Sequence, residues 1–153
     1  MSAVSLRVNG QTYDVVVEDR WSLADTLRDQ VGLTGTHLGC EQGVCGACTV
    51  LLDGQPVRAC LLLAAQCEGA EITTAEADND EFVAEARSRL VAENGLQCGF
   101  CTPGFVALLA GLRRLEWTGT EAELTEVLSA SVCRCTGYTG IIRAAAQVLD
   151  VRS

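Results

Sequence analysis

The stretch GCEQGVCGACTVLLDG, residues 39–54, places three cysteines in a glycine-rich loop directly before an apolar segment. Cys40, Cys45 and Cys48 follow the spacing C-x4-C-x2-C, which is the ligand spacing of plant-type [2Fe–2S] proteins. Glycines let the backbone pass close to an inorganic core and direct amide N–H groups at negatively charged sulfur. The loop therefore predicts a [2Fe–2S] site whose fourth cysteine ligand comes from elsewhere in the chain.

The fourth ligand is predicted to be Cys60. Asp53-Gly54 is a hairpin signal between two apolar segments that we expect to be strands, the second over residues 56–64. The hairpin would return this strand, and Cys60 with it, alongside the cysteine loop. Cys67 is the alternative ligand, but a small apolar packing residue near a strand end is the simpler interpretation.

A second group of cysteines lies in QCGFCTPG and CRCTGY, and comprises Cys98, Cys101, Cys133 and Cys135. Cys101 is expected just before a helix N-terminus, where the helix dipole favours thiolate over thiol. Cys133 and Cys135 would project to the same side of an extended backbone, shortly before a helix that starts at Thr139. Taken alone this group fits zinc equally well, but beside a plant-type loop a second iron–sulfur site is favoured.

The N-terminal half has strand patterning. Residues 3–18 alternate apolar and polar side chains around Asn9-Gly10, which is typical of a type I′ hairpin. Ser22 can cap a short helix, and a last strand is expected to end at about Thr74. We therefore predict a β-grasp domain of the plant-type ferredoxin kind over residues 1–76.

The C-terminal half has helical patterning after a polar linker at residues 75–80. Four amphipathic helices with short connections predict a four-helix bundle over residues 77–153, and so an α+β fold for the whole chain. The helices are expected to run through Phe82, Ala86 and Leu90 to a C-cap at Gly95, and to start at Thr102-Pro103, Thr120 and Thr139.

Composition excludes several classes of function. The formal charge of −9 disfavours nucleic acid and anionic membranes as partners, and no apolar run is long enough to span a bilayer. Nine cysteines, an odd number without a visible secretory signal, favour metal binding in the cytoplasm over a disulfide framework. No glycine-rich nucleotide motif is present, and His37 has no evident catalytic partner, so we expect no catalytic residue in this chain.

The three cysteine motifs, in this order, resemble the small iron–sulfur subunit of the molybdenum hydroxylases. This is the xanthine oxidase family, here in the three-subunit form typified by aerobic carbon monoxide dehydrogenase. The resemblance covers roughly residues 3–150. It implies two [2Fe–2S] clusters in this chain, FAD in a medium subunit and molybdopterin cytosine dinucleotide in a large subunit, assembled as a dimer of heterotrimers.

The resemblance also implies roles for individual residues. Gln97 matches a glutamine whose amide hydrogen-bonds the pterin, and Cys135 matches the cluster ligand closest to that pterin. The chain would relay electrons one at a time from molybdopterin to FAD. We expect the first cluster to be shallow and to face flavin, and the second to be screened from solvent among residues such as Phe100 and to face molybdenum. A free two-cluster ferredoxin and a zinc-stabilised interaction module are the alternatives.

Overall fold

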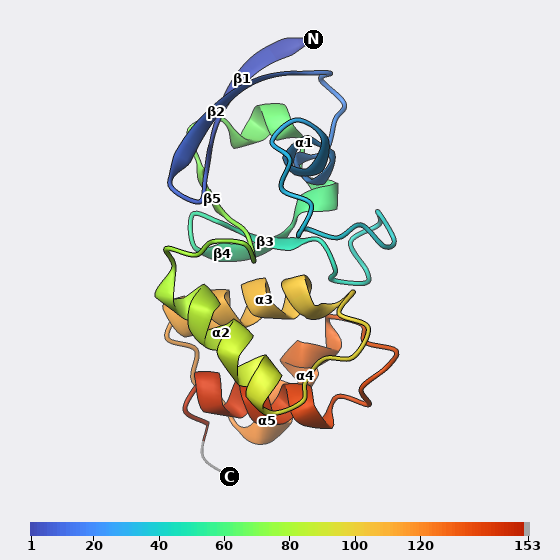
Figure 1. Cartoon of the computed structure of the whole chain (residues 1–153), viewed down its shortest axis with the longest axis vertical. Coiled ribbons are helices and arrows are strands. Elements are labelled where there is room, and N and C mark those ends of the chain that lie inside the picture. Colours follow the sequence, from blue (N-terminus) through green and yellow to red (C-terminus); the bar gives the residue numbers. More distant parts are fainter. Residues whose placement is uncertain (152–153) are drawn as a thin grey trace.

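The computed structural model describes residues 1–151, in which a sheet with one helix is stacked on a layer of four helices (Figure 1). Strands β1 (Ser2–Val8) and β2 (Gln11–Val17) form an antiparallel hairpin. Asn9 and Gly10 in its turn both have positive φ, 52° and 80°, as a type I′ turn requires. The predicted first hairpin is confirmed.

The sheet is mixed and has the order β2-β1-β5-β3-β4. Strand β3 (Thr49–Leu52) pairs antiparallel with β4 (Gln55–Arg58) and with β5 (Glu71–Thr73), and β5 pairs parallel with β1. Helix α1 (Leu23–Asp29), capped by the Ser22 side chain as predicted, contributes Leu23 and Leu27 to the apolar core of this half. The result is an α+β fold of the ferredoxin-like kind.

The strand predicted over residues 56–64 is wrong beyond Arg58. There the chain leaves the sheet and forms two short 3-10 helices, η1 (Ala59–Leu61) and η2 (Ala64–Cys67). The Leu62 carbonyl accepts from Leu23 N–H at 2.7 Å, and Ala64 N–H donates to the Trp21 carbonyl at 3.0 Å. These backbone groups therefore pair with the start of α1 rather than with a neighbouring strand, and Cys60 lies on a helical turn.

The C-terminal half contains four α-helices that share one apolar core. They are α2 (Glu81–Ala92), α3 (Thr102–Arg114), α4 (Glu121–Ser129) and α5 (Thr139–Val148). Helix α2 packs on α3 and α5, α4 packs on α5, and α3 also contacts β3 and β4. Helix α3 thus lies between the sheet and the remaining helices (Figure 1), and no helix of the described chain is long and apolar enough to cross a bilayer.

Two predicted helix ends differ slightly from those observed. The residue that precedes α3 is Cys101 rather than Thr102, so Pro103 falls in the first turn rather than at its first position. After α2 the left-handed residue is Asn94, with φ 53°, and Gly95 follows it, donating its N–H to the Leu90 carbonyl at 2.8 Å. The predicted start of α4 is confirmed, because Thr120 forms a reciprocal capping box with Glu123.

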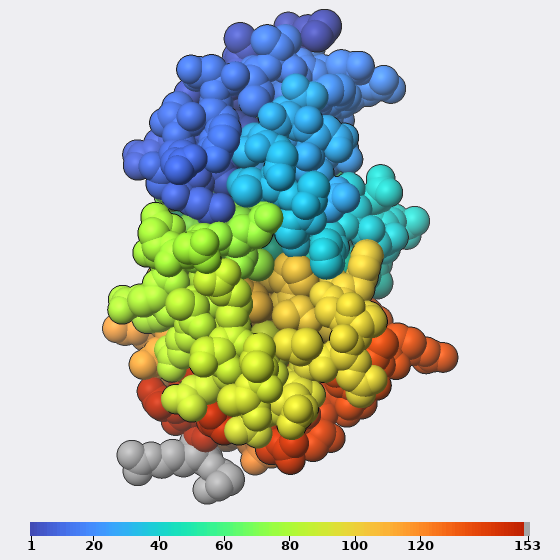
Figure 2. All heavy atoms as spheres, in the orientation of Figure 1, coloured from blue at the N-terminus to red at the C-terminus, as the bar shows by residue number. Residues whose placement is uncertain are grey.

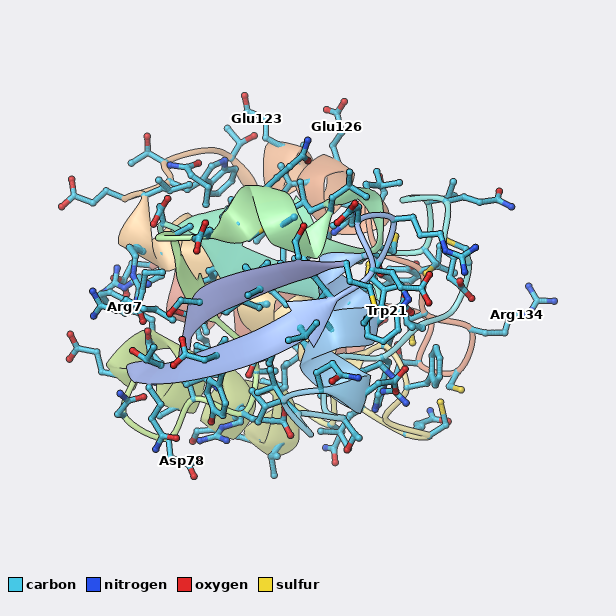
Figure 3. The ribbon with its side chains drawn as sticks, turned by 90° about the horizontal axis from the view of Figure 1, so that it is seen from above. Arg7, Trp21, Asp78, Glu123, Glu126 and Arg134 are labelled. Carbon is cyan, nitrogen blue, oxygen red and sulfur yellow. The ribbon has the colours of Figure 1, made fainter. Side chains whose placement is uncertain are left out.

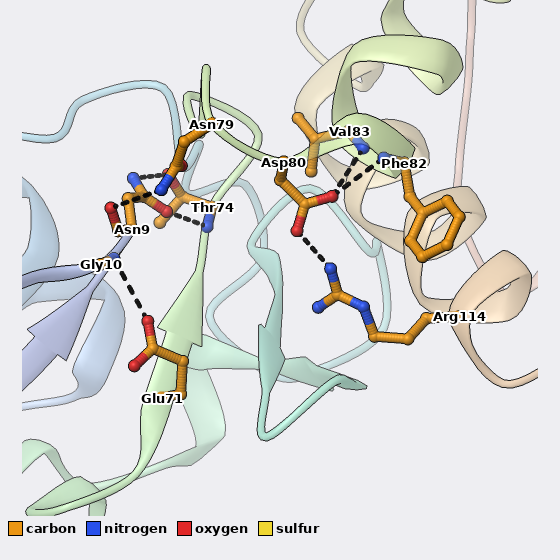
Figure 4. A network of polar contacts seen from close by, with 9 residues as sticks. All are labelled: Asn9, Gly10, Glu71, Thr74, Asn79, Asp80, Phe82, Val83 and Arg114. Carbon is orange, nitrogen blue, oxygen red and sulfur yellow. Dashed lines mark hydrogen bonds and ion pairs between the residues drawn. The ribbon is translucent and has the colours of Figure 1, made fainter.

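The predicted linker is tied to both halves by polar contacts (Figure 4). Asn79 donates its side-chain N–H to the Asn9 carbonyl at 3.4 Å, and the Asn9 side chain accepts from Thr74 N–H at 2.8 Å and donates to the Thr74 hydroxyl at 2.9 Å. Asp80 accepts from the N–H groups of Phe82 and Val83, which caps α2, and it also pairs with Arg114 of α3. The cap and the ion pair together fix the direction in which α2 leaves the sheet.

The Asp80 contacts predict a measurable loss of stability. Asp80→Ala removes the cap of α2 and leaves Arg114 without its partner, so we expect the free energy of unfolding to fall by about 2 kcal/mol. Asp78→Ala is the matched control, because the Asp78–Arg87 pair is exposed and its loss should cost less than about 0.5 kcal/mol. Urea unfolding of both variants measures this, and equal midpoints for the two would contradict it.

Candidate metal centres

The first thiol set, Cys40, Cys45, Cys48 and Cys60, is built around the loop between α1 and β3. The Cys40 sulfur accepts from the backbone N–H groups of Gln42 at 3.3 Å and Cys45 at 3.4 Å. The Cys45 and Gln42 N–H groups, in that order, are the main causes that lower the pKa of Cys40 to about 6. The loop thus directs amide dipoles at sulfur, as its glycines predict.

Glycine is required at several points of this loop. Gly43 and Gly46 have φ of 78° and 80°, a region that other residues rarely adopt. A Cβ atom on Gly39 would lie 3.1 Å from the Cys45 sulfur. A side chain at Gly43 or Gly46 would strain the backbone, and one at Gly39 would crowd the Cys45 thiol.

Cys60, on η1, lies beside Cys48 despite the change from strand to 3-10 helix. The pKa of Cys60 is raised to about 11, first by burial and then by its side-chain contact with Cys48, against an opposing effect of the Gly43 N–H. Cys40 makes the corresponding side-chain contact with Cys45. The four thiols therefore form two neighbouring pairs, which suits a [2Fe–2S] core because each of its irons takes two protein ligands.

Cys67 has different surroundings. Its side chain is buried in the core of the sheet half, and its sulfur lies 3.5 Å from the Leu63 carbonyl. Burial, followed by the charge of Asp53, raises the pKa of Cys67, and no other cysteine is among the causes. These contacts are those of a packing residue.

The second thiol set, Cys98, Cys101, Cys133 and Cys135, lines one cavity of about 220 Å³ together with Cys45. Burial raises the pKa of Cys101 to about 12, with a further contribution from its contact with Cys133. Contact with Cys98 raises the pKa of Cys135. This set also forms two pairs, and no three His, Cys, Asp or Glu side chains among residues 1–151 come close enough to share one ion.

The loops that carry the second set also supply polar contacts to sulfur. The Phe100 N–H points at the Cys98 sulfur at 3.5 Å, and the Thr136 hydroxyl lies 3.1 Å from the Cys133 sulfur. Burial acts to raise the pKa of Cys133, but the Thr136 contacts and neighbouring N–H groups outweigh it and leave that pKa lowered. Arg134, between the last two cysteines, points away from the protein (Figure 3).

The expectation that the second set is screened from solvent is wrong for this chain. Cys98 and Cys135 are exposed, as is Gln97, whereas Cys48 of the first set is 3% exposed. Phe100 and Val132 are also turned outward, with exposed fractions of 49% and 52%. The physical reason is that these residues lie on the loops before α3 and α5, outside the apolar core that the helices enclose.

The two cysteine-bearing regions are in direct contact (Figure 2). The Val132 N–H donates to the Cys45 carbonyl at 2.8 Å, which links neighbours of the two thiol sets through backbone. His37 Nδ1 lies 2.7 Å from the Phe100 carbonyl, and the two rings stack with centroids 4.9 Å apart. His37 is therefore a packed loop residue, and no local sequence signal indicates its contact with Phe100.

Comparison with known proteins agrees with these features. A family model described as "2Fe-2S iron-sulfur cluster binding domain" matches residues 6–88, and one described as "[2Fe-2S] binding domain" matches residues 71–146. The chain is 48% identical to caffeine dehydrogenase subunit gamma of Pseudomonas sp. (strain CBB1), covering 92% of this chain and 87% of that protein. It is 46% identical to the nicotine 6-hydroxylase small subunit of Paenarthrobacter nicotinovorans, covering 96% and 87%.

A solved structure extends the likeness to the whole fold. A chain of quinoline 2-oxidoreductase from Pseudomonas putida 86 superposes with a TM-score of 0.89 at 43% identity, covering 97% of this chain and 94% of that one. A second match, aldehyde oxidoreductase from Desulfovibrio gigas, has a TM-score of 0.87 at 36% identity, but this chain spans only 17% of it. From its cysteine motifs, its fold and these relatives, the chain belongs to the family of small iron–sulfur subunits of the molybdenum hydroxylases.

Proposed function

We propose that this chain is the electron-transfer subunit of a molybdenum hydroxylase. It would hold two [2Fe–2S] clusters between a molybdopterin site in a large subunit and FAD in a medium subunit. The observation that carries the proposal is the arrangement of eight thiols in two sets of two pairs on contacting loops. When bound, each cluster supplies one-electron redox chemistry, which divides a two-electron oxidation into single steps.

The chain's own residues would bind and tune the clusters. We infer that the first cluster is held by Cys40, Cys45, Cys48 and Cys60, and the second by Cys98, Cys101, Cys133 and Cys135. The backbone N–H groups of Gln42, Cys45 and Phe100 would stabilise negative charge on the ligand sulfurs. The two clusters would lie in separate domains, a β-grasp domain over residues 1–76 and a four-helix bundle over 77–153, of which 152–153 lie outside the described residues.

The exposed side of the second set supports a direction for electron transfer. Gln97 and Cys135 are exposed, and Cys135 lines the same cavity as Phe100 and Val132, whose side chains are also exposed. A partner that covers them would screen the cluster, and the Gln97 amide offers two donors and an acceptor to a pterin edge. We therefore infer that the second cluster faces the molybdopterin of the large subunit and that the first faces FAD of the medium subunit.

Co-purification tests the assignment against a free ferredoxin. Tagged chain isolated from its native host should bring down two larger subunits, one with molybdopterin cytosine dinucleotide and one with FAD, as a cytoplasmic dimer of heterotrimers. The names of the relatives above include the nitrogen heterocycles caffeine, nicotine and quinoline, so we infer this class as the first substrates to assay. Isolation of the chain alone with both clusters would instead favour the ferredoxin.

The first prediction concerns cluster content. Anaerobically purified chain should contain about four irons and as much acid-labile sulfide, because each [2Fe–2S] cluster holds two of each. Full reduction should give two distinct paramagnetic signals. About two irons per chain, or a single signal, would show that only one thiol set binds a cluster, and zinc without sulfide would favour the interaction module.

The second prediction separates Cys60 from Cys67. Cys60→Ala should lose about half of the iron and the signal of the first cluster only, because the Cys48 thiol loses its neighbour. Cys67→Ala should keep all iron, since Cys67 contacts no other thiol and only fills space in the core. Iron analysis with electron paramagnetic resonance (EPR) checks both variants, and the reverse pattern would make Cys67 the fourth ligand.

The third prediction concerns Gln97. In the assembled enzyme, Gln97→Leu should slow reduction of the second cluster by substrate about tenfold, as expected for one lost hydrogen bond of ~1.4 kcal/mol. Its iron content and the step from the first cluster to FAD should not change. Gln66→Leu, an exposed glutamine on η2, is the matched control. A slowed flavin step with an unchanged substrate step, measured by stopped-flow absorbance, would reverse the proposed order of clusters.

A further inference from the structure

Arg58 lies at the end of β4 and reaches three segments that come together only in the fold. Its guanidinium donates from Nε to the Gly43 carbonyl at 3.4 Å and from Nη2 to the Ala130 carbonyl at 2.5 Å, and from Nη1 to the Thr49 hydroxyl. Gly43 belongs to the loop of the first thiol set, and Ala130 ends α4 just before the segment that carries Cys133. Arg58 therefore ties the loop of the first thiol set to the end of α4.

The contacts of Arg58 orient the peptide groups of the first cysteine loop. Thr49 links Arg58 to Gly46, because its hydroxyl accepts from the guanidinium and donates to the Gly46 carbonyl at 2.7 Å. The Gly43 carbonyl thus accepts directly from the guanidinium, and the Gly46 carbonyl is linked to it through the Thr49 hydroxyl. These two carbonyls lie on either side of Cys45 in the chain. In a trans peptide the C=O and N–H point in opposite directions, and residues 1–151 contain no cis peptide.

The peptide held by Arg58 lies in the segment of the loop that faces the Cys40 sulfur. The peptide whose carbonyl is Gly43 has the Val44 N–H on its other side, and this N–H points away from Arg58. On either side of this peptide, the Gln42 and Cys45 N–H groups donate to the Cys40 sulfur at 3.3 Å and 3.4 Å. A guanidinium that holds the Gly43 carbonyl thereby fixes the loop segment whose amide dipoles point at a ligand sulfur.

The charge of Arg58 adds to this effect. All three of its acceptors are neutral, and no carboxylate among residues 1–151 lies within ion-pair distance of it. A guanidinium stays protonated at all ordinary pH values. An unpaired positive charge beside the first thiol set stabilises the negative charge that a cluster gains on reduction.

We propose that Arg58 is a positioning residue that raises the reduction potential of the first cluster relative to the second, by orienting the amides of the cysteine loop and by its own charge. This inference rests on the proposed function, since it requires both clusters. Its effect is to favour the electron at the first cluster, from which it passes to FAD. The contact with Ala130 fixes the guanidinium in place, because the last carbonyls of a helix lack partners within the helix.

The test is an EPR-monitored redox titration of the full chain with both clusters bound. In Arg58→Met, the equilibrium that distributes one electron between the clusters should shift about tenfold away from the first, or ~59 mV for a one-electron couple. The second potential and the iron content should not change. Electron–nuclear double resonance should also lose an exchangeable-proton coupling at the first cluster, which a purely structural role would not predict.

A conservative variant separates orientation from charge. Arg58→Lys keeps the charge but lacks the planar fork that reaches three acceptors, so it should recover only part of the shift. Full recovery by lysine would overturn the orienting role, and no recovery would overturn the role of charge. Thr49→Val removes the relay to Gly46 without altering charge, and it should shift the first potential in the same direction by a smaller amount, even where Arg58→Met does not fold.

Arg28→Met is the matched control. Arg28 also donates to neutral backbone carbonyls, those of Thr34 and Thr36, but both precede the cysteine loop. Its replacement should leave both potentials unchanged, and an equal shift in Arg28→Met would overturn the proposal. Native chain with fewer than two clusters would refute the proposed function, whereas two clusters with unshifted potentials in Arg58→Met would refute the role of Arg58 alone.

Discussion

The contact between the first cysteine loop and the start of α3 decides how the two halves of the molecule fit. A Cβ atom on Gly104 would lie 2.2 Å from the Gly46 carbonyl oxygen, and one on Gly46 would lie 2.4 Å from the Ser131 hydroxyl. Backbone therefore packs on backbone where the loop meets α3 and the segment after α4. This close approach also allows the Val132 N–H to bond the Cys45 carbonyl, so the two thiol sets lie on adjoining loops. Any side chain at these glycines would move the sets apart.

The elements that the sequence predicted correctly are those set by local chemistry. The Asn9-Gly10 turn, the Ser22 cap and the Thr120 capping box each depend on residues only a few positions apart. The spacings C-x4-C-x2-C and C-x-C are also local signals, whereas the assignment of Cys60 and the grouping of Cys98 and Cys101 with Cys133 and Cys135 join distant segments and stay predictions. Such signals identify the family and most element boundaries without knowledge of the tertiary fold.

The features that sequence could not predict depend on tertiary contacts. Strand β4 stops at Arg58 because the backbone groups of Leu62 and Ala64 bond to the start of α1, which a continuous apolar run does not reveal. The hydrophobicity of Phe100 predicts a core residue, yet about half of its surface is exposed. Arg58 is an ordinary strand arginine in the sequence, and its position becomes evident only when residues 43, 49 and 130 come together.

The shifted pKa values of three thiols link cluster binding to proton release. Cys40 has a pKa of about 6 and is a thiolate near neutral pH, whereas burial and neighbouring thiols keep Cys60 and Cys101 protonated, with pKa values of about 11 and 12. Because iron binds the thiolate form, binding at Cys60 and Cys101 displaces a proton from each of these thiols. The burial that holds the protons of Cys60 and Cys101 also strengthens electrostatic interactions near these two sulfurs. The exposed Cys98 and Cys135 lack such surroundings in the isolated chain, and in the proposed complex the large subunit would have to supply them. In the proposed complex, the properties of the first cluster would therefore be set mainly within this chain, and those of the second would be completed by assembly.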